Sequence, residues 1–190
     1  MSRGFTVVEL LITLVIMTIL LTLGVVSVRS TLINARDSER KEDISVLARG
    51  LELYYDKGLN GSIPGTYPGY NDLWYGAIYG TNLKPITTYA PGSSLANWKT
   101  PNDGGTEMIC IFRSPSGLWP TAPGCESPGN QTTAQNQISP DKYGYESLRR
   151  DGAFCYVPNP ASPNSMCTSF NLYWIDEASG QLKVYKSKHR

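Results

Sequence analysis

One glutamate has an unusual setting for a charged side chain. Glu9 is the only charged residue between positions 5 and 28, and almost all of its neighbours are apolar. A carboxylate in a membrane-spanning segment costs about 2.5–3.5 kcal/mol near the bilayer centre. The N-terminus of a helix favours an acidic group, and a nearby amine would neutralise it. Glu9 therefore predicts a positively charged partner close to the start of this apolar run.

Four cysteines form the second group with clear chemistry. They are Cys110, Cys125, Cys155 and Cys167. Four cysteines allow three pairings, of which we expect the local one, 110 with 125 and 155 with 167. Each bridge would contribute about 3 kcal/mol through loop-closure entropy. Zinc is not favoured, because the chain has no C-x-x-C spacing and no histidine near these positions. Disulfides indicate a compartment outside the cytoplasm.

Catalytic chemistry has little support in the sequence. His189 is the one histidine, and we expect it at the surface near a frayed end. No nucleophile motif accompanies it, so we expect no catalytic residue and no enzyme activity. The segments 102–106 (NDGGT) and 176–180 (DEASG) carry oxygens that suit calcium, but neither matches a full ligand pattern. We expect ordinary turns there, no metal site and no cofactor.

The charge balance excludes one class of partner. The 190 residues include 17 Lys and Arg against 16 Asp and Glu, for a net charge of +1. Nucleic-acid binding requires a basic patch or stripe, and this balance does not suggest one. No nucleic acid is therefore expected as a partner.

The apolar run from Phe5 to Val28 is long enough to cross a membrane. As a helix, its 24 residues span about 36 Å at about 1.5 Å per residue. A secretory signal peptide fits poorly, because the run is long, its basic region is one arginine and no small-x-small cleavage site follows. We expect Arg3 in the cytoplasm and the cysteine-bearing part outside. Arg29 and Arg36 flank the other end, so the positive-inside signal is weak.

Helical periodicity continues beyond this run. An apolar stripe is expected at Leu32, Ile44, Leu47, Leu51 and Tyr54, with charged residues filling much of 36–43. The Asp37/Lys41 pair, four residues apart, would support the helix. Residues 1–63 contain no proline, so one continuous helix is predicted from about Phe5 to about Lys57, capped by Gly58. Its second half should pack on the domain.

The remainder of the chain favours short strands and turns. It holds 17 of the 20 aromatic residues and all four cysteines. Strands are predicted at 107–112, 143–148 and 153–158, with a short helix at about 72–79. The clearest hairpin joins 169–176 to 181–187 through the turn EASG. These elements predict an α+β fold in which a small antiparallel sheet of three or four strands packs on the helix.

The stretch RGFTVVELLITLVIMTILLTLG, residues 3–24, resembles the class III signal sequence of type IV pilins and type II secretion pseudopilins. The resemblance implies a leader peptide at 1–4, cleavage after Gly4 and N-methylation of Phe5. It makes Glu9 the assembly glutamate, at the fifth position of the mature chain. The stretch ARDSERKEDISVLARGLELYYDKG and the later TYP are similar to the segment that follows the membrane helix in many pilins. This second similarity extends the resemblance to about residue 68.

The sequence departs from the family in one place. Family members commonly carry a proline late in the apolar helix, which lets the helix melt locally in filaments, and Val26 stands about there. Gly24 is the one helix-weakening residue nearby. Glycine costs about 1 kcal/mol relative to alanine and proline about 3. This departure puts local melting near Gly24 in question.

The family resemblance implies a pilin-like fold and a structural role. It divides the chain into a leader (1–4), a membrane and filament-core helix (5–28), its amphipathic continuation (29–57) and an extracytoplasmic β-rich domain (58–190). The implied partners are other pilin subunits, a prepilin peptidase, the membrane, and indirectly an assembly platform with its ATPase motor. The chain would leave the inner membrane for a cell-surface filament, or fimbrium.

Glu9 would set the register of subunits in such a filament. Cleavage after Gly4 leaves an amine on Phe5, and Glu9 could pair with its own amine or with that of a neighbour. An unpaired charge in a dry filament core is costly, which penalises misplaced subunits. The rival interpretations are a pseudopilin of a type II secretion or DNA-uptake machine, a minor tip pilin acting as adhesin, and a membrane-tethered exported enzyme.

Overall fold

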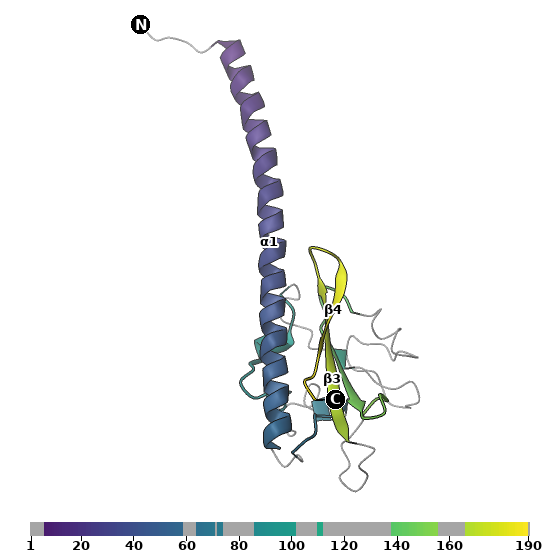
Figure 1. Cartoon of the computed structure of the whole chain (residues 1–190). Coiled ribbons are helices and arrows are strands. Elements are labelled where there is room, and N and C mark those ends of the chain that lie inside the picture. Colours follow the sequence, from purple (N-terminus) through teal and green to yellow (C-terminus); the bar gives the residue numbers. More distant parts are fainter. Residues whose placement is uncertain are drawn as a thin grey trace.

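The chain is described by a computed structural model that covers residues 6–58, 64–70, 72–73, 86–101, 110–111, 138–155 and 166–189. One long helix, α1 (Val7–Lys57), projects well beyond a small sheet that packs against its second half (Figure 1). Two short 3-10 helices and four strands follow: η2 (Ile86–Thr88), η3 (Leu95–Trp98), β1 (Cys110–Ile111), β2 (Gly144–Arg149), β3 (Cys167–Asp176) and β4 (Gln181–Lys186). The fold is α+β, with a pilin-like arrangement of helix and sheet.

Helix α1 is unbroken over 51 residues, as its lack of proline predicts. At about 1.5 Å per residue it is about 76 Å long. Thr6 caps its N-terminus, so the helix begins two residues later than Phe5. At the other end Gly58 adopts a left-handed conformation with φ of 57°, and its N–H donates to the Tyr54 carbonyl. Glycine tolerates this conformation because it has no Cβ, which confirms the predicted cap.

The two halves of α1 have opposite environments. Described side chains from Val7 to Leu32 are all exposed, and the first half of α1 extends beyond the sheet domain (Figure 1). This is the one helix among the described residues that is long and apolar enough, by length and composition, to cross a membrane. Leu32 is 52% exposed, so its predicted place in the buried stripe was wrong. The exposed stretch ends at Ile33, which is half-buried, and Asp37 is the first buried residue among the described side chains of α1.

The sheet has the strand order β1-β2-β3-β4. Strands β2, β3 and β4 are antiparallel, as predicted. The fourth strand, β1, extends this antiparallel sheet at its edge, where it pairs with β2 in parallel. More than 30 residues separate β1 from β2 along the chain, and a parallel pair needs such a long connection.

The predicted hairpin is confirmed, and another predicted strand is not. Strands β3 and β4 pair from Asn171↔Lys186 to Asp176↔Gln181, around the turn 177–180. At 153–155 the chain forms only an isolated bridge, Phe154 to Leu148, because it leaves the sheet directly after the turn that ends β2. Residues 156–158 lie outside the described residues. So do 107–109 and 112 of the first predicted strand, and 71 and 74–79 around the predicted short helix.

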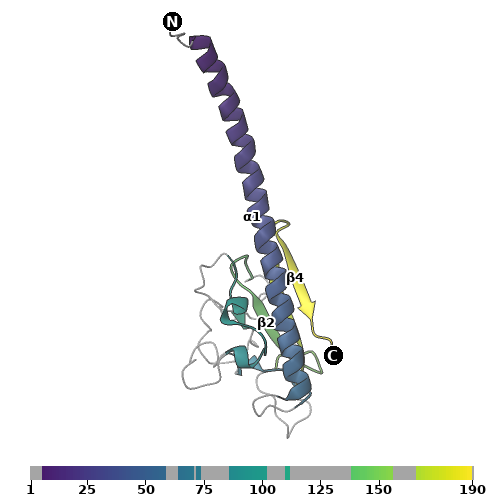
Figure 2. The same cartoon turned by 90° about the vertical axis from the view of Figure 1, so that its left-hand side faces the viewer.

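The hydrophobic core lies between the second half of α1 and one face of the sheet (Figure 2). Leu47 and Leu51 of α1 pack in one cluster with Phe170 and Leu172 of β3, and all four are fully buried. The predicted stripe members Ile44 and Tyr54 belong to the same cluster, as do several tyrosines and Trp98. At Gly50 the helix approaches Ala90 so closely that a Cβ would lie 2.7 Å from the Ala90 carbonyl carbon.

Candidate assembly helix and its attachment to the domain

The N-terminus of α1 is held by a reciprocal pair of side chains. The Thr6 hydroxyl accepts a hydrogen bond from the Glu9 N–H at 3.3 Å, and Glu9 Oε2 accepts from the Thr6 N–H at 2.9 Å. The Thr6 hydroxyl also donates to Glu9 Oε2 at 2.9 Å. This capping box satisfies amide groups that the first turn of a helix leaves without partners. Glu9 therefore stabilises the start of its own helix.

The capping box bears on the predicted role of Glu9. Both hydrogen bonds to the Glu9 carboxylate end on Oε2, so Oε1 can still accept from a further donor. The carboxylate is exposed at the positive end of the helix dipole, the position at which an acid is favoured. Gly4 and Phe5, the predicted cleavage and methylation positions, lie outside the described residues.

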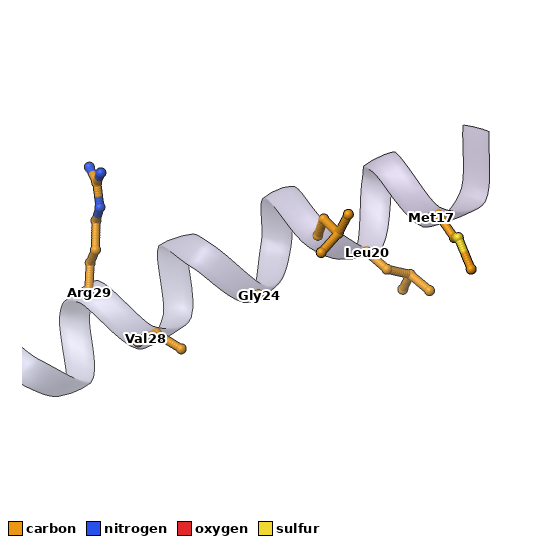
Figure 3. A pocket seen from close by; sticks show the side chains of 6 residues that line it. Met17, Leu20, Gly24, Val28 and Arg29 are labelled. Carbon is orange, nitrogen blue, oxygen red and sulfur yellow. The ribbon is translucent and has the colours of Figure 1, made fainter. Parts of the chain in front are cut away.

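An apolar notch lies along the exposed half of α1, at Gly24. It has a volume of about 580 Å³, and its lining is almost entirely apolar (Figure 3). Met17, Leu20 and Val28 are among its residues, and Arg29 stands at one end. Apart from the neighbouring residues and nearby backbone of the helix itself, no described atom lies within 4 Å of the position that a Cβ on Gly24 would take. The helix continues through Gly24 and Val26 without a break.

A cluster of four charged residues attaches α1 to the β3–β4 turn. Asp37 accepts hydrogen bonds from the N–H groups of Glu177 and Ala178, at 2.8 and 2.9 Å. Arg40 donates to Asp37 at 2.7 Å and to Glu177 at 3.0 Å, and Arg36 pairs with Glu177 as well. We call Arg36, Asp37, Arg40 and Glu177 the helix–turn clamp. It joins residues about 140 positions apart at the first contact between helix and domain.

The electrostatics of this clamp favour its charged forms. Burial by itself would raise the pKa of Asp37, but the two backbone N–H donors and Arg40 outweigh it and lower that pKa to about 2. The hydrogen bond from Arg36 lowers the pKa of Glu177. Arg40 is fully buried, and it also donates to the Pro140 carbonyl at 3.1 Å. Asp37 and Arg40 form the buried part of the clamp, and a buried ion pair is costly to break by removing one partner.

Sequence patterns did not reveal the clamp. The sequence favours a pair between Asp37 and Lys41, yet the structure pairs Asp37 with Arg40. Asp37, Arg40 and Asp43 recur at intervals of three on the same side as Ile44 and Leu47, and all three are buried. Charged residues in register with an apolar stripe are the signal that would have found them.

Two further acids of α1 are buried against the domain. Asp43 accepts from the Tyr143 hydroxyl at 2.9 Å and from the Asn97 amide at 2.8 Å. Glu52 accepts from the Tyr67 hydroxyl at 2.7 Å and from the Lys188 N–H at 2.9 Å. Burial raises the pKa of Asp43. Glu52 fixes the end of the chain to the last turns of α1, at the opposite end of the interface from the clamp.

His189 belongs to this second attachment. Its ring stacks on Tyr55 with centroids 4.2 Å apart, and Nε2 lies 3.6 Å from a Glu52 oxygen and 3.7 Å from an Asp56 oxygen. The side chain is 42% exposed, so a surface location was right, but the expected frayed end was wrong. Stacking on Tyr55 and the Lys188 hydrogen bond hold this segment in place.

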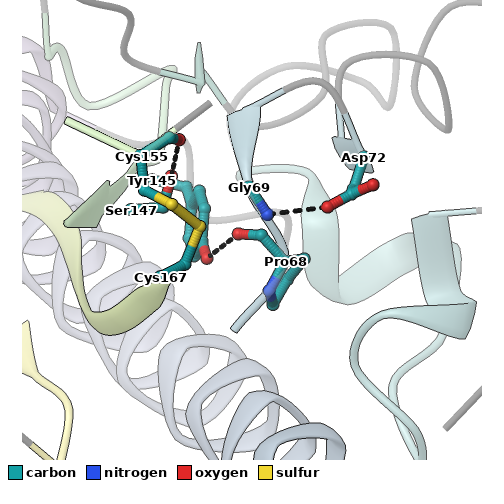
Figure 4. The surroundings of a disulfide bond; sticks show 7 residues. All are labelled: Pro68, Gly69, Asp72, Tyr145, Ser147, Cys155 and Cys167. Atoms are coloured by element: carbon teal, nitrogen blue, oxygen red, sulfur yellow. Dashed lines mark hydrogen bonds between the residues drawn. A yellow bond between two sulfur atoms is a disulfide. The ribbon is translucent and has the colours of Figure 1, made fainter. Parts of the chain in front are cut away.

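The disulfide between Cys155 and Cys167, one of the two expected local bridges, joins the segment after β2 to the start of β3 (Figure 4). The Cα atoms are 5.4 Å apart. Beside the bridge, the Ser147 hydroxyl donates to the Cys155 carbonyl at 2.8 Å, and the Tyr145 hydroxyl donates to the Pro68 carbonyl at 2.7 Å (Figure 4). The expected partner of Cys110, Cys125, lies outside the described residues.

The described residues hold no group of three or more His, Cys, Asp or Glu that could bind a metal ion. The segment 176–180, considered for calcium, consists of the last residue of β3 and the β3–β4 turn. In it Glu177 pairs with two arginines instead. The other segment considered, 102–106, lies outside the described residues.

Comparison with protein families identifies one region of the chain. Residues 1–25 match the family model described as the prokaryotic N-terminal methylation motif. This is the class III signal motif of pilins, and the match includes Gly4, Phe5 and Glu9. Comparison with curated proteins and comparison with solved structures each find no match to the chain. The match and the exposed apolar helix together support a protein that is like a pilin or pseudopilin in its N-terminal region.

Proposed function

We propose that this chain is a structural subunit of a type IV pilus. One observation carries the proposal: the methylation motif of residues 1–25 begins a helix whose described side chains are all exposed as far as Leu32. Among the described residues seventeen large apolar side chains are exposed, and fifteen of them lie between Val7 and Leu32. Such a surface requires either a lipid environment or the helices of other subunits. In pilin-type assembly the helix lies in lipid before polymerisation and against the helices of other subunits after it.

The maturation steps follow from the motif. A prepilin peptidase cuts after Gly4, and the new amine on Phe5 becomes methylated. Thr6 and Glu9 both belong to the mature chain, so the capping box remains after cleavage. The helix then begins two residues after a cationic amine, with a carboxylate oxygen in its first turn available for a neighbour's amine. That pair fixes the register between adjacent subunits.

The proposed topology places residues 5–28 in the membrane and 58–190 outside the cytoplasm. The segment 29–57 connects the membrane segment to the domain without a break in the helix, and the domain packs on the second half of α1. In the filament the helices would line the core and the disulfide-bonded domains would coat it. The notch at Gly24 suits close approach of a neighbouring helix, because no side chain fills it. The role is structural, and the chain is cargo for an ATP-driven assembly platform.

The first test is mass spectrometry of filaments sheared from the native cells. Abundant chain beginning at a methylated Phe5 would support a major pilin. Processed chain that is absent from the sheared fraction would contradict a major pilin and favour a pseudopilin or a rare tip subunit. An intact Met1 in the membrane fraction, or cleavage near Val28, would overturn the pilin interpretation altogether.

A second test separates the two roles of Glu9. Glu9→Gln keeps an oxygen that can accept from the Thr6 N–H but removes the charge, whereas Thr6→Val removes the hydroxyl of the capping box and keeps the charge. We expect Glu9→Gln to be processed and yet missing from filaments. Thr6→Val, the matched control, should still assemble. Equal assembly of both variants would show that the charge of Glu9 does not set the register.

A further inference from the structure

A cavity of about 270 Å³ with a mixed polar and apolar lining lies on the sheet, where β2 and β4 end and β3 begins. Pairing places Leu148 opposite Ser169, and Asn171 opposite Lys186, and all four line the cavity. Phe170 and Leu172 point into the core against α1. Because side chains alternate along a strand, Ser169 and Asn171 lie on the other face. The cavity therefore opens on the side of the sheet that α1 does not cover.

A β-bulge shapes this cavity. The register shifts between Leu148 and Arg149, so that Arg149 is opposite Cys167 and Thr168 is the extra residue of β3. Bulges redirect side chains and are frequent beside binding sites. Thr168 Oγ1 and Arg149 Nε are both buried without a hydrogen-bond partner, and both residues line the cavity. Buried polar atoms in native proteins nearly always have a partner, so these two N–H and O–H groups are donors available to a molecule bound in the cavity.

The charge of the lining selects the kind of ligand. Arg149, Arg150 and Lys186 contribute three positive charges. Of the nearby acids, Asp151 is exposed and pairs with Arg149 at 3.3 Å, and Glu146 accepts from the Asn171 amide and the Tyr173 hydroxyl, each at 2.6 Å. Positive charge therefore remains in excess. Guanidinium and hydroxyl donors around one cavity match the oxygens of a phosphate or sulfate group.

We propose that this cavity, the anion cavity, binds a phosphate or sulfate group, either as a free ion or on a sugar. A water molecule occupies about 30 Å³ of liquid, so the volume holds about nine waters, enough for one tetrahedral anion with its attached sugar carbons. The site is independent of filament assembly and adds a ligand-binding role to the domain.

The anion cavity faces away from the membrane end of the molecule. The β3–β4 turn meets α1 at Asp37, whereas the end of β4 meets it at Glu52 through Lys188. These positions are 15 residues apart on α1, or about 22 Å along its axis. The cavity lies at the Glu52 end, so solutes outside the cell can reach it while the apolar half of α1 is in the membrane.

Isothermal titration of the full chain in a non-ionic detergent tests the proposal. The four probes are inorganic phosphate, inorganic sulfate, glucose 6-phosphate and glucose 6-sulfate. We expect saturable binding at one site, weakened about tenfold or more by Arg149→Gln and by Lys186→Gln. Thr168→Val, which removes only the hydroxyl, should weaken binding about threefold. Lys183→Gln is the matched control on the other face of β4, and it should change binding less than twofold.

Each result decides the proposal. Absence of saturable binding for all four probes at millimolar concentration would overturn it. So would equal losses in Lys183→Gln and Lys186→Gln, since these would indicate attraction to net charge alone. Tighter binding of the sugar esters than of the inorganic ions would identify a sugar-borne group, and equal binding would identify the free ion. Thermal unfolding checks each variant; if Arg149→Gln does not fold, Lys186→Gln and Thr168→Val still give the answer.

Discussion

The substitution Asp37→Asn tests the importance of the helix–turn clamp. Asp37 is 4% exposed and accepts from two backbone N–H groups and from Arg40. An asparagine of the same shape offers one acceptor oxygen and places an N–H₂ group against other donors. The change also leaves the buried Arg40 with one carboxylate partner instead of two. We expect the domain to lose stability at neutral pH.

The size of this loss follows from the pKa of Asp37. Folding lowers that pKa from its ordinary 3.8 to about 2. Each pKa unit corresponds to about 1.36 kcal/mol, so the charged form of Asp37 stabilises the folded state by about 2.5 kcal/mol at neutral pH. Because the folded pKa is the lower one, this contribution is present above about pH 4 and is lost as the pH falls through 2. Asp37→Asn should therefore cost about 2–3 kcal/mol at pH 7 and progressively less below pH 4.

The measurement is guanidinium unfolding of the full chain in mild detergent, followed by tryptophan fluorescence at several pH values from 2 to 7. Glu39→Gln is the matched control, since Glu39 is an exposed carboxylate on the same turn of α1. It should change the free energy of unfolding by less than about 0.5 kcal/mol. A loss below that value for Asp37→Asn, or a loss that stays constant down to pH 2, would refute the reasoning.

Three further predictions concern packing, the disulfide and a second buried acid. Gly50→Ala should lower the free energy of unfolding by about 1–3 kcal/mol, because the new Cβ would collide with Ala90. Gly24→Ala is the control, since Gly24 lies in open space, and it should leave the thermal unfolding of the domain unchanged. Equal effects of the two substitutions would contradict the described packing. Replacing both Cys155 and Cys167 by alanine should cost about 3 kcal/mol in guanidinium unfolding, and a loss under about 1 kcal/mol would argue against the loop-closure account. Asp43→Asn should lower the free energy of unfolding by less than about 1 kcal/mol at pH 7, because burial raises the pKa of Asp43 and so disfavours its charged form. For the same reason, protonation of Asp43 should stabilise the folded protein as the pH falls toward 3.8. A loss as large as that of Asp37→Asn would contradict this.

Local signals predicted the elements of this fold well. Helix α1 follows from the absence of proline before residue 64 and from the glycine at 58, and the β3–β4 hairpin follows from two alternating runs around EASG. Each of these signals acts within a few residues, so no knowledge of the rest of the chain is needed. The methylation motif is equally local, and it is also what the family comparison detects.

The features that escaped prediction depend on residues far apart in sequence. The charges of Asp37 and Arg40 resemble a solvated helix face until Glu177, about 140 residues away, is placed beside them. Leu32 fits the periodicity of the core, but the domain does not extend far enough along α1 to cover it. The anion cavity requires the bulge at Thr168, and one extra residue in a strand leaves no mark in the sequence.

The two attachments between α1 and the sheet domain also determine how the molecule carries mechanical load. Tension applied to the apolar half of the helix runs parallel to the interface, with the helix–turn clamp at its near end and the Glu52–Lys188 contact at its far end. Because this tension is parallel to the interface, it loads the contacts between α1 and the sheet domain in shear and at the same time, rather than one after another. Detaching the domain therefore requires many contacts to fail at once, which makes this joint strong along the helix axis and weaker to a sideways pull on the β3–β4 turn.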